Sequence, residues 1–240
     1  MINSNTTVRE VAIEVPQSTR LFEKLKIDYC CGGNRSLTEA CNSAGVEVDK
    51  VLGMLETAIQ QVEAVNISTE FQKFTTDGLI EHIVSVHHVF TKDELSRLDL
   101  LIKKVIAAHG ENHPELNSVG GLFDRLSADL MPHMFKEERV LFPYISALAQ
   151  ANAQHTPAPF APFGTVKNPV RMMMMEHDVA GEILREIRKV TSDYTVPSDG
   201  CISYRTLYEA LEALEKDLHQ HIHLENNILF PRAVELEEGS

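Results

Sequence analysis

The sequence has no apolar run of 18 residues, which is about the length that a membrane-spanning helix needs. It has only 4 cysteines among 240 residues, and in a cytosolic chain so few thiols argue against a disulfide framework. Basic side chains are outnumbered, 22 Lys and Arg against 35 Asp and Glu, and the resulting net charge of −13 opposes binding to phosphate backbones or anionic membranes. The first ten residues lack the basic start and apolar run of a signal peptide. We therefore expect a cytoplasmic protein without nucleic-acid or membrane partners.

The sequence does contain an internal repeat. The whole sequence is 43% hydrophobic and 24% charged, which is ordinary for a soluble globular protein. Residues 129–143 return 88 positions later as residues 217–231, with seven of fifteen positions identical. In each copy an Asp, a His and a Glu recur at four-residue intervals, which places all three on one face of a helix. They are Asp129, His133 and Glu137 in the first copy and Asp217, His221 and Glu225 in the second.

A further histidine precedes each copy at almost the same distance. His88 lies 45 residues before His133, and His177 lies 44 residues before His221. Residues equidistant from a short turn between antiparallel helices lie at the same height. The midpoints fall in turn-like sequences near residues 110–111 and 199, and a third break falls at residues 156–164. The pattern predicts an all-α protein in which residues 71–240 form an up-down-up-down four-helix bundle.

Six of these side chains would meet inside that bundle. Two glutamates and four imidazoles are costly in a core unless something compensates them. Imidazole and carboxylate ligands projecting from facing helices suit a dinuclear metal site, in which each glutamate can bridge two ions. A single helical histidine is more often a surface or hydrogen-bonded core residue, but six residues matched in type, spacing and height favour metal. The predicted ligands are His88, His133, Glu137, His177, His221 and Glu225.

Ligand type alone leaves manganese, iron and zinc open, since all three accept mixed imidazole and carboxylate sites. It does predict a dependence on acidity. Imidazole must be neutral to bind a metal, and its reference pKa is about 6.5. Metal should therefore be lost as the pH falls below that value.

Residues 1–70 carry none of this pattern and are predicted to form a separate small helical domain. Short helices are expected at residues 8–15, 18–25, 37–44 and 49–65, the last with Asp49 as its N-cap. Between the second and third comes Cys30-Cys31-Gly32-Gly33. The two glycines allow a tight turn that leaves both thiols near the surface. Two interpretations stay open: small apolar side chains at a turn, or a redox or metal-handling pair. Cys41 and Cys201 are expected to be structural.

In the bundle, helices are expected at residues 76–109, capped by Thr76, at 119–150, and from about 168 and 203 onward. Pro132 and Pro143 should bend the second helix. Four consecutive methionines, residues 172–175, are expected to fill the core. Asp129 and Asp217 either accept a hydrogen bond from a ligand imidazole or are surface acids. Glu138 and Glu176, each beside a predicted ligand, should face partly away from it.

Both parts of the chain resemble a known family. The bundle is similar to the hemerythrin HHE group, whose pattern of a histidine followed by HxxxE, given twice, matches the six predicted ligands. Residues 1 to about 65, with Asp28-Tyr29-Cys30-Cys31-Gly32-Gly33, resemble the domain joined to that bundle in the repair of iron centres family, also known as ScdA or YtfE. The resemblance implies two non-haem iron ions, with room for an oxo or hydroxo bridge, and a role in restoring iron-sulfur clusters damaged by nitric oxide or hydrogen peroxide.

The same resemblance implies iron-sulfur proteins as clients, nitric oxide or oxygen as small ligands, a cytoplasmic location and, as one oligomeric form, a homodimer. It also implies functional roles for Cys30, Cys31 and Glu176, whereas Asp129 stands where the family usually has a glutamate. Three functions stay open: a di-iron repair protein that donates iron or removes nitric oxide, a hemerythrin-like sensor or carrier, and a di-iron nitric oxide reductase. A metal-free interaction bundle is the remaining alternative.

Overall fold

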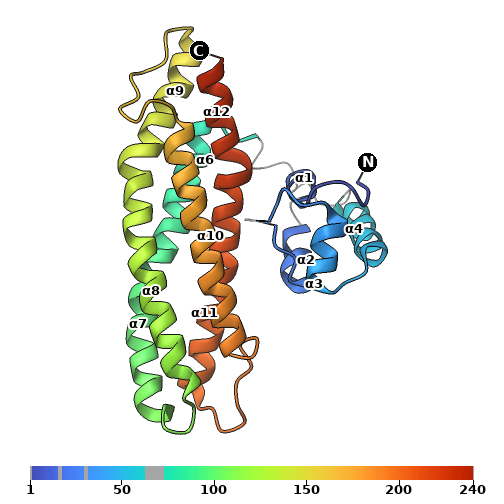
Figure 1. The fold of residues 1–240 in the computed structure, drawn as a ribbon, viewed down its shortest axis with the longest axis vertical. Coiled ribbons are helices and arrows are strands. Elements are labelled where there is room, and N and C mark those ends of the chain that lie inside the picture. Colours follow the sequence, from blue (N-terminus) through green and yellow to red (C-terminus); the bar gives the residue numbers. More distant parts are fainter. Residues whose placement is uncertain (1, 16–17, 30–31, 63–72, 240) are drawn as a thin grey trace.

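The computed structural model describes residues 2–15, 18–29, 32–62 and 73–239. Its long part is a bundle of four helical segments that run alternately up and down (Figure 1). The predicted all-α fold is confirmed, and the described residues form no β-strand. The segments are α6 (Thr76–His82), η1 (Ile83–His88) and α7 (Val89–His109); α8 (Glu115–Lys136), η2 (Glu137–Leu141) and α9 (Phe142–Gln154); α10 (Lys167–Val190); and α11 (Ile202–Leu224), η3 (Glu225–Leu229) and α12 (Phe230–Glu238).

Two apolar clusters fill the bundle, one on each side of the level at which the predicted ligands meet. One cluster contains residues such as Leu98, Phe123 and Leu214, and the other contains residues such as Ile145 and Phe230. All five side chains are buried. The polar level between the clusters is therefore shielded from water along the bundle axis.

Three bundle segments contain a short π-helix at the level of the predicted ligands. His88 is the last residue of η1, Glu137 is the first of η2, and Glu225 is the first of η3. Pro143 and Pro231 each follow a π-helix as the second residue of the next α-helix, where a missing N–H is tolerated. Single π-turns inside α-helices often occur at functional sites because the extra residue redirects side chains. The bend expected at Pro132 does not interrupt α8, which continues to Lys136.

The N-terminal residues form four short helices, α1 (Val8–Glu14), α2 (Ser18–Leu25), α3 (Leu37–Ala44) and α4 (Val48–Val62), around a hydrophobic core of their own. Reciprocal capping boxes, Thr7 with Glu10 and Ser36 with Glu39, start α1 and α3. Cys41 is buried in this core, as expected for a structural cysteine. Because α4 begins at Val48, Asp49 lies in its first turn and is not the predicted cap. The predicted boundary near residue 70 lies outside the described residues and stays a prediction.

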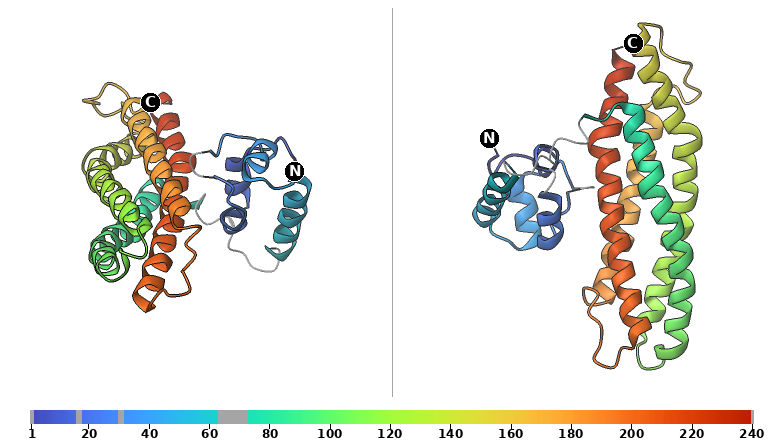
Figure 2. Two further views of the ribbon diagram at one scale, coloured as in Figure 1. Left: turned by 60° about the horizontal axis from the view of Figure 1, so that its bottom comes forward. Right: turned by 180° about the vertical axis from the view of Figure 1, so that it is seen from behind.

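This small helical unit lies beside α10, η3 and α11 of the bundle (Figures 1 and 2). The guanidinium of Arg9 donates to the backbone carbonyl of Asn227 at 3.0 Å, and the side-chain amide of Asn227 donates to the carbonyl of Tyr29 at 3.3 Å. Lys26 forms an ion pair with Asp193 at 2.6 Å. The bundle contact of the N-terminal unit therefore includes η3, the π-helix that begins with Glu225.

Several local expectations were wrong. The hydroxyl of Thr75, not of Thr76, caps α6 by accepting from the N–H of Gly78. Only Met173 of the four consecutive methionines is buried, because the other three lie on the remaining faces of α10. Cys201 is exposed at the start of α11 instead of being packed.

In the part of the chain that is described, no helix is both long enough and apolar enough to cross a membrane.

Candidate metal centre

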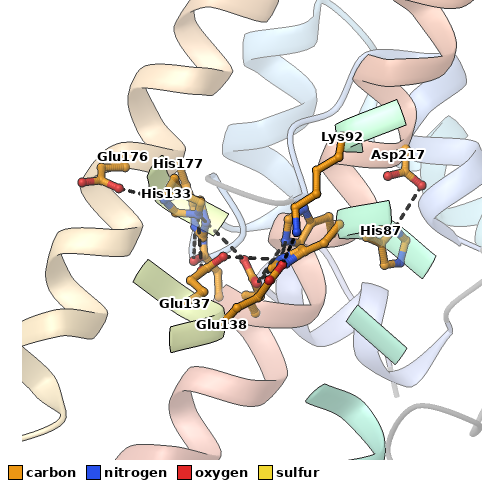
Figure 3. A network of polar contacts seen from close by, with 12 residues as sticks. His87, Lys92, His133, Glu137, Glu138, Glu176, His177 and Asp217 are labelled. Carbon is orange, nitrogen blue, oxygen red and sulfur yellow. Dashed lines mark hydrogen bonds and ion pairs between the residues drawn. The ribbon is translucent and has the colours of Figure 1, made fainter. Parts of the chain in front are cut away.

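The structure brings the six predicted ligands together in two groups that share both glutamates. In each group, one candidate ligand atom per residue can be chosen so that all lie within 4.8 Å of one another, and every member is buried. The dashed contacts of Figure 3 join these side chains across the four bundle segments. The first group is His88, Glu137, His221 and Glu225, and the second is His133, Glu137, His177 and Glu225.

Each shared carboxylate directs one oxygen to each group. For Glu137, Oε2 lies 3.5 Å from Nε2 of His88, and Oε1 lies 3.3 Å from Nε2 of His133. For Glu225, Oε1 lies 3.0 Å from Nε2 of His221, and Oε2 lies 3.2 Å from Nε2 of His177. Both oxygens of Glu137 are buried without a hydrogen-bond partner in the described part of the chain. Two carboxylates placed in this way can each bridge a pair of metal ions.

The outer nitrogens of three of the imidazoles are held by neighbouring side chains. Nδ1 of His133 lies 2.8 Å from Oε2 of Glu176, and Nδ1 of His177 lies 2.9 Å from Oδ1 of Asn226. Nδ1 of His88 lies 2.8 Å from Oε1 of Glu138. If each Nδ1–H donates outward, the neutral ring presents a lone pair inward at Nε2, the tautomer that metal-binding histidines use.

The inner nitrogens then need a positive charge between them. Nε2 of His133 lies 3.0 Å from Nε2 of His177, and two lone pairs at that distance repel each other. Either bound protons or metal ions can compensate them, together with the two buried carboxylates. The donor set of four imidazole nitrogens and two bridging carboxylates fits a pair of first-row transition-metal ions.

Each of the two glutamates that contact a ligand imidazole from outside also accepts a hydrogen bond from a lysine. Lys92 donates to Glu138 at 2.6 Å, and Lys136 donates to Glu176. Burial raises the pKa of each of these glutamates, but the lysine and histidine hydrogen bonds outweigh it and lower the pKa below its usual value. Both therefore stay ionised as acceptors for a ligand imidazole, and a carboxylate behind an imidazole strengthens it as a metal ligand.

Protons and metal compete for the same nitrogens. Burial lowers the pKa of His88, but the adjacent carboxylates of Glu137 and Glu225 raise it to about 10. Burial likewise lowers the pKa of His133, and the charge of Glu137 leads the effects that raise it to about 9. Burial lowers the pKa of His221. The carboxyl groups of Glu137 and Glu225 have lowered pKa values because the neighbouring histidines outweigh their burial.

We therefore expect metal affinity to fall as the pH falls through 10 and 9, earlier than the reference pKa of imidazole alone indicates. Below its raised pKa each of His88 and His133 holds a proton that a metal must displace, so each contributes up to about tenfold in affinity per pH unit. Calorimetric titration with Fe²⁺ or Co²⁺ in buffers of different ionisation enthalpy should show proton release on binding. An affinity that is unchanged between pH 6 and 9 would contradict this.

Of the four acidic residues that the sequence placed near the ligands, two contact a ligand imidazole and two do not. Glu176 accepts from a predicted ligand, as does Glu138, although the sequence suggested that both face partly away. Asp129 is exposed, which agrees with the surface-acid alternative, and the outer partner of His133 is Glu176. Asp217 contacts His87, not a predicted ligand. Cys30 and Cys31 lie outside the described residues.

Two residues of the site were missed by the sequence reasoning. Asn226 accepts from His177, and the ring of His87 stacks on that of His221 at a centroid distance of 5.8 Å. Each directly adjoins a predicted ligand in the chain and contacts a ligand that comes from another segment. Adjacency to a ligand was the available signal, but the partner could be assigned only once the segments were packed.

A four-helix bundle whose doubled histidine and HxxxE motif brings two buried groups of histidine and glutamate side chains together is typical of the hemerythrin-like class of cation-binding protein. Residues 79–233 match the Hemerythrin HHE cation binding domain, and residues 4–59 match a domain of unknown function, DUF542 or ScdA_N. Relatives that are 31% and 32% identical over nearly the full length are named as iron-sulfur cluster repair proteins, so the chain belongs to that family.

Curated relatives support this membership over nearly the full length. The iron-sulfur cluster repair protein YtfE of Yersinia pseudotuberculosis serotype IB (strain PB1/+) is 31% identical over 230 residues, covering 96% of this chain and 97% of the relative. A probable iron-sulfur cluster repair protein of Haemophilus influenzae is 32% identical over 225 residues, covering 94% and 95%. YtfE of Yersinia pestis (strain Pestoides F) is 31% identical over 230 residues.

Proposed function

We propose that the chain is a di-iron protein that repairs damaged iron-sulfur clusters in the cytoplasm, by donating iron to them or by removing nitric oxide. The single observation that supports this best is the pair of buried carboxylates, each with one oxygen directed to either half of a four-histidine cluster. The names of the relatives supply the cluster-repair role. A homodimer stays a prediction from the sequence.

The proposed ligands are His88, His133, Glu137, His177, His221 and Glu225. Iron bound there would supply Lewis acidity and one-electron redox chemistry. The chain holds the inner nitrogens in place through Glu138, Glu176 and Asn226. The apolar clusters above and below exclude bulk water, which strengthens electrostatic interactions at the site.

The two halves of the cluster differ in how their histidines are held. In one half, His133 contacts a carboxylate and His177 contacts a neutral amide. In the other half, His88 contacts a carboxylate, and Nδ1 of His221 has no hydrogen-bond partner among the described residues. A carboxylate makes an imidazole a stronger donor than an amide does, because it stabilises positive charge on the ring. Unequal donors of this kind support a site in which one ion leaves, or reacts, more readily than the other.

The cysteine pair is the proposed link between the metal centre and its clients. The carbonyl of Tyr29, the residue before the pair, accepts from Asn227 of η3, two positions after Glu225. Replacing both thiols, Cys30→Ser/Cys31→Ser, is expected to reduce the recovery of a nitric-oxide-damaged cluster several-fold, while the iron content is unchanged. Recovery is measured as the return of activity of a cluster-dependent enzyme.

Cys201→Ser is the matched control, because Cys201 is an exposed thiol at the start of α11, outside the metal centre. It should leave recovery unchanged. Full recovery with both serines at 30 and 31 would remove the thiols from the proposal. Consumption of nitric oxide with product formation under reducing, anaerobic conditions, without cluster recovery, would favour a nitric oxide reductase, and a reversible oxygen-bridged absorption band without turnover would favour a sensor or carrier.

A further inference from the structure

His221 is held differently from the other three candidate ligand histidines. His88, His133 and His177 each direct Nδ1 to a side-chain oxygen at 2.8 to 2.9 Å. Nδ1 of His221 is buried and has no hydrogen-bond partner among the residues described. When Nε2 binds a metal, Nδ1 carries the ring proton, and an N–H left unpaired in a protein interior is destabilising.

Three further buried polar atoms on the neighbouring residues share this property. They are Nε2 of His87, Oγ1 of Thr91 and Oδ2 of Asp217, none of which has a partner in the described ranges. The four residues come from two adjacent antiparallel segments, one of them η1 with α7 and the other α11. The His87 ring stacks on that of His221 at an interplanar angle of 10°.

The antiparallel packing of these two segments also places Thr91 and Asp217 at one height along the bundle. Thr91 follows His87 by four residues, and Asp217 precedes His221 by four, so one turn along each antiparallel helix brings Thr91 level with Asp217. The contact between Nδ1 of His87 and Oδ1 of Asp217, at 3.0 Å, ties the two levels together (Figure 3). Four unpaired polar atoms therefore belong to one small region behind His221.

These atoms offer complementary hydrogen-bonding roles. The ring N–H of His221 and the hydroxyl of Thr91 donate, whereas the free oxygen of Asp217 accepts. Nε2 of His87 also accepts when the Nδ1–H of that ring donates to Asp217. Two donors and two acceptors are what one fully bonded water molecule needs, and buried waters typically make two to four hydrogen bonds to such groups.

We propose that His87, Thr91, Asp217 and His221 form a binding site for an internal water molecule that accepts a hydrogen bond from the ring N–H of His221. The inference rests on the ligand role of His221 in the proposed function. The outer contact of His221 is then made through a water molecule, unlike the direct carboxylate contacts behind His88 and His133. Thr91 and Asp217 are thus positioning residues for the metal half that contains His88 and His221.

Two substitutions test the site in the iron-loaded full-length protein. Thr91→Val replaces the hydroxyl with a methyl group of similar shape, and Asp217→Asn removes the carboxylate. Each should increase the rate at which one of the two irons passes to a chelator by about tenfold, as is usual when an outer partner of a metal ligand is lost, while the other iron leaves at the wild-type rate. Asp129→Asn is the matched control, since Asp129 is the equivalent residue of the other repeat and is exposed.

Two direct readouts accompany the kinetics. A high-resolution crystal structure of the wild-type protein should show a water molecule within hydrogen-bond reach of Nδ1 of His221, and Thr91→Val should lose it. In nuclear magnetic resonance spectra of the ferrous protein, the paramagnetically shifted ring N–H signal of His221 should move in Thr91→Val, whereas the ring N–H signals of the other ligands should stay in place.

Wild-type release rates in both variants, or a wild-type structure without this water, would overturn the proposal. Equal acceleration of both irons would also overturn it, because the site serves only one half. These outcomes are separable from a failure of the proposed function. A protein that binds two irons but restores no cluster would leave every readout here unchanged, whereas a protein that binds no iron would remove the ligand role itself.

Discussion

Glu137→Gln and Glu225→Gln, each made singly, are expected to lower iron affinity by more than about 100-fold, beyond the 10–100-fold typical of losing an outer partner of a metal ligand. Each glutamate directs an oxygen to both halves of the cluster, so one substitution removes a negatively charged donor from two ions at once. The amide is nearly the same size, so the apolar packing around it is retained. Iron per chain is measured by elemental analysis after anaerobic loading, with the helical content followed by circular dichroism.

Glu94→Gln provides the control for this result. Glu94 is also a buried carboxylate of the bundle, but its partner is Arg97 on the same helix. Its loss should leave two irons per chain. If Glu137→Gln or Glu225→Gln also bound two irons with wild-type affinity, the shared carboxylates could not be bridging ligands.

The second large effect is expected on the stability of the fold, with no change in iron binding. Glu215→Ala should lower the free energy of unfolding by about 3 kcal/mol, because the largely buried Arg188 guanidinium loses its buried partner and keeps only the more exposed Asp193. The Glu215 side chain is only 2% exposed, accepts two hydrogen bonds from Arg188 at 3.1 and 2.6 Å, and accepts another from Tyr194 at 2.9 Å. These contacts hold the turn after α10, where Ser192 and Asp193 have φ of 50° and 61°. Denaturant unfolding of the variant and the parent measures the difference.

Glu212→Ala is the matched control on the same helix. Its side chain is 39% exposed and pairs with Lys216, which is 49% exposed, so screening by solvent should limit its effect to less than about 0.5 kcal/mol. Equal destabilisation by the two substitutions would mean that burial of the Glu215 network contributes nothing. Iron per folded chain should remain two in both variants.

The repeat in the sequence was sufficient to predict the bundle and the convergence of the six side chains. The near-equal separations of 45 and 44 residues selected His88 over its neighbour His87, which the apolar face of the helix could not do. The structure places Nε2 of His88 3.1 Å from Nε2 of His221. The register between antiparallel helices follows from the number of residues that separate each position from the turn, so it could be predicted from the sequence.

The π-helices could not be predicted in the same way. Pro143 and Pro231 indicated a local irregularity, but residue propensities do not distinguish a bend from an inserted residue. In the structure the extra residue falls at η2 and η3, each beginning with a predicted ligand.

Contacts between segments were also beyond the sequence pattern. Asp129 and Asp217 occupy equivalent positions of the repeat, yet one is exposed and the other contacts His87. The difference arises because His133 has Glu176 as an outer partner, whereas His221 has no such carboxylate in the described structure. The repeat specified the residues facing inward, and the neighbouring helices determined the partners behind them.

The most direct test of the central claim is the metal content of freshly purified, anaerobically handled protein, combined with Mössbauer spectroscopy. The account predicts two iron ions per chain, magnetically coupled through shared ligands, and the loss of that coupled signal in Glu137→Gln. A chain that binds no iron, or two isolated and uncoupled ions, would contradict it.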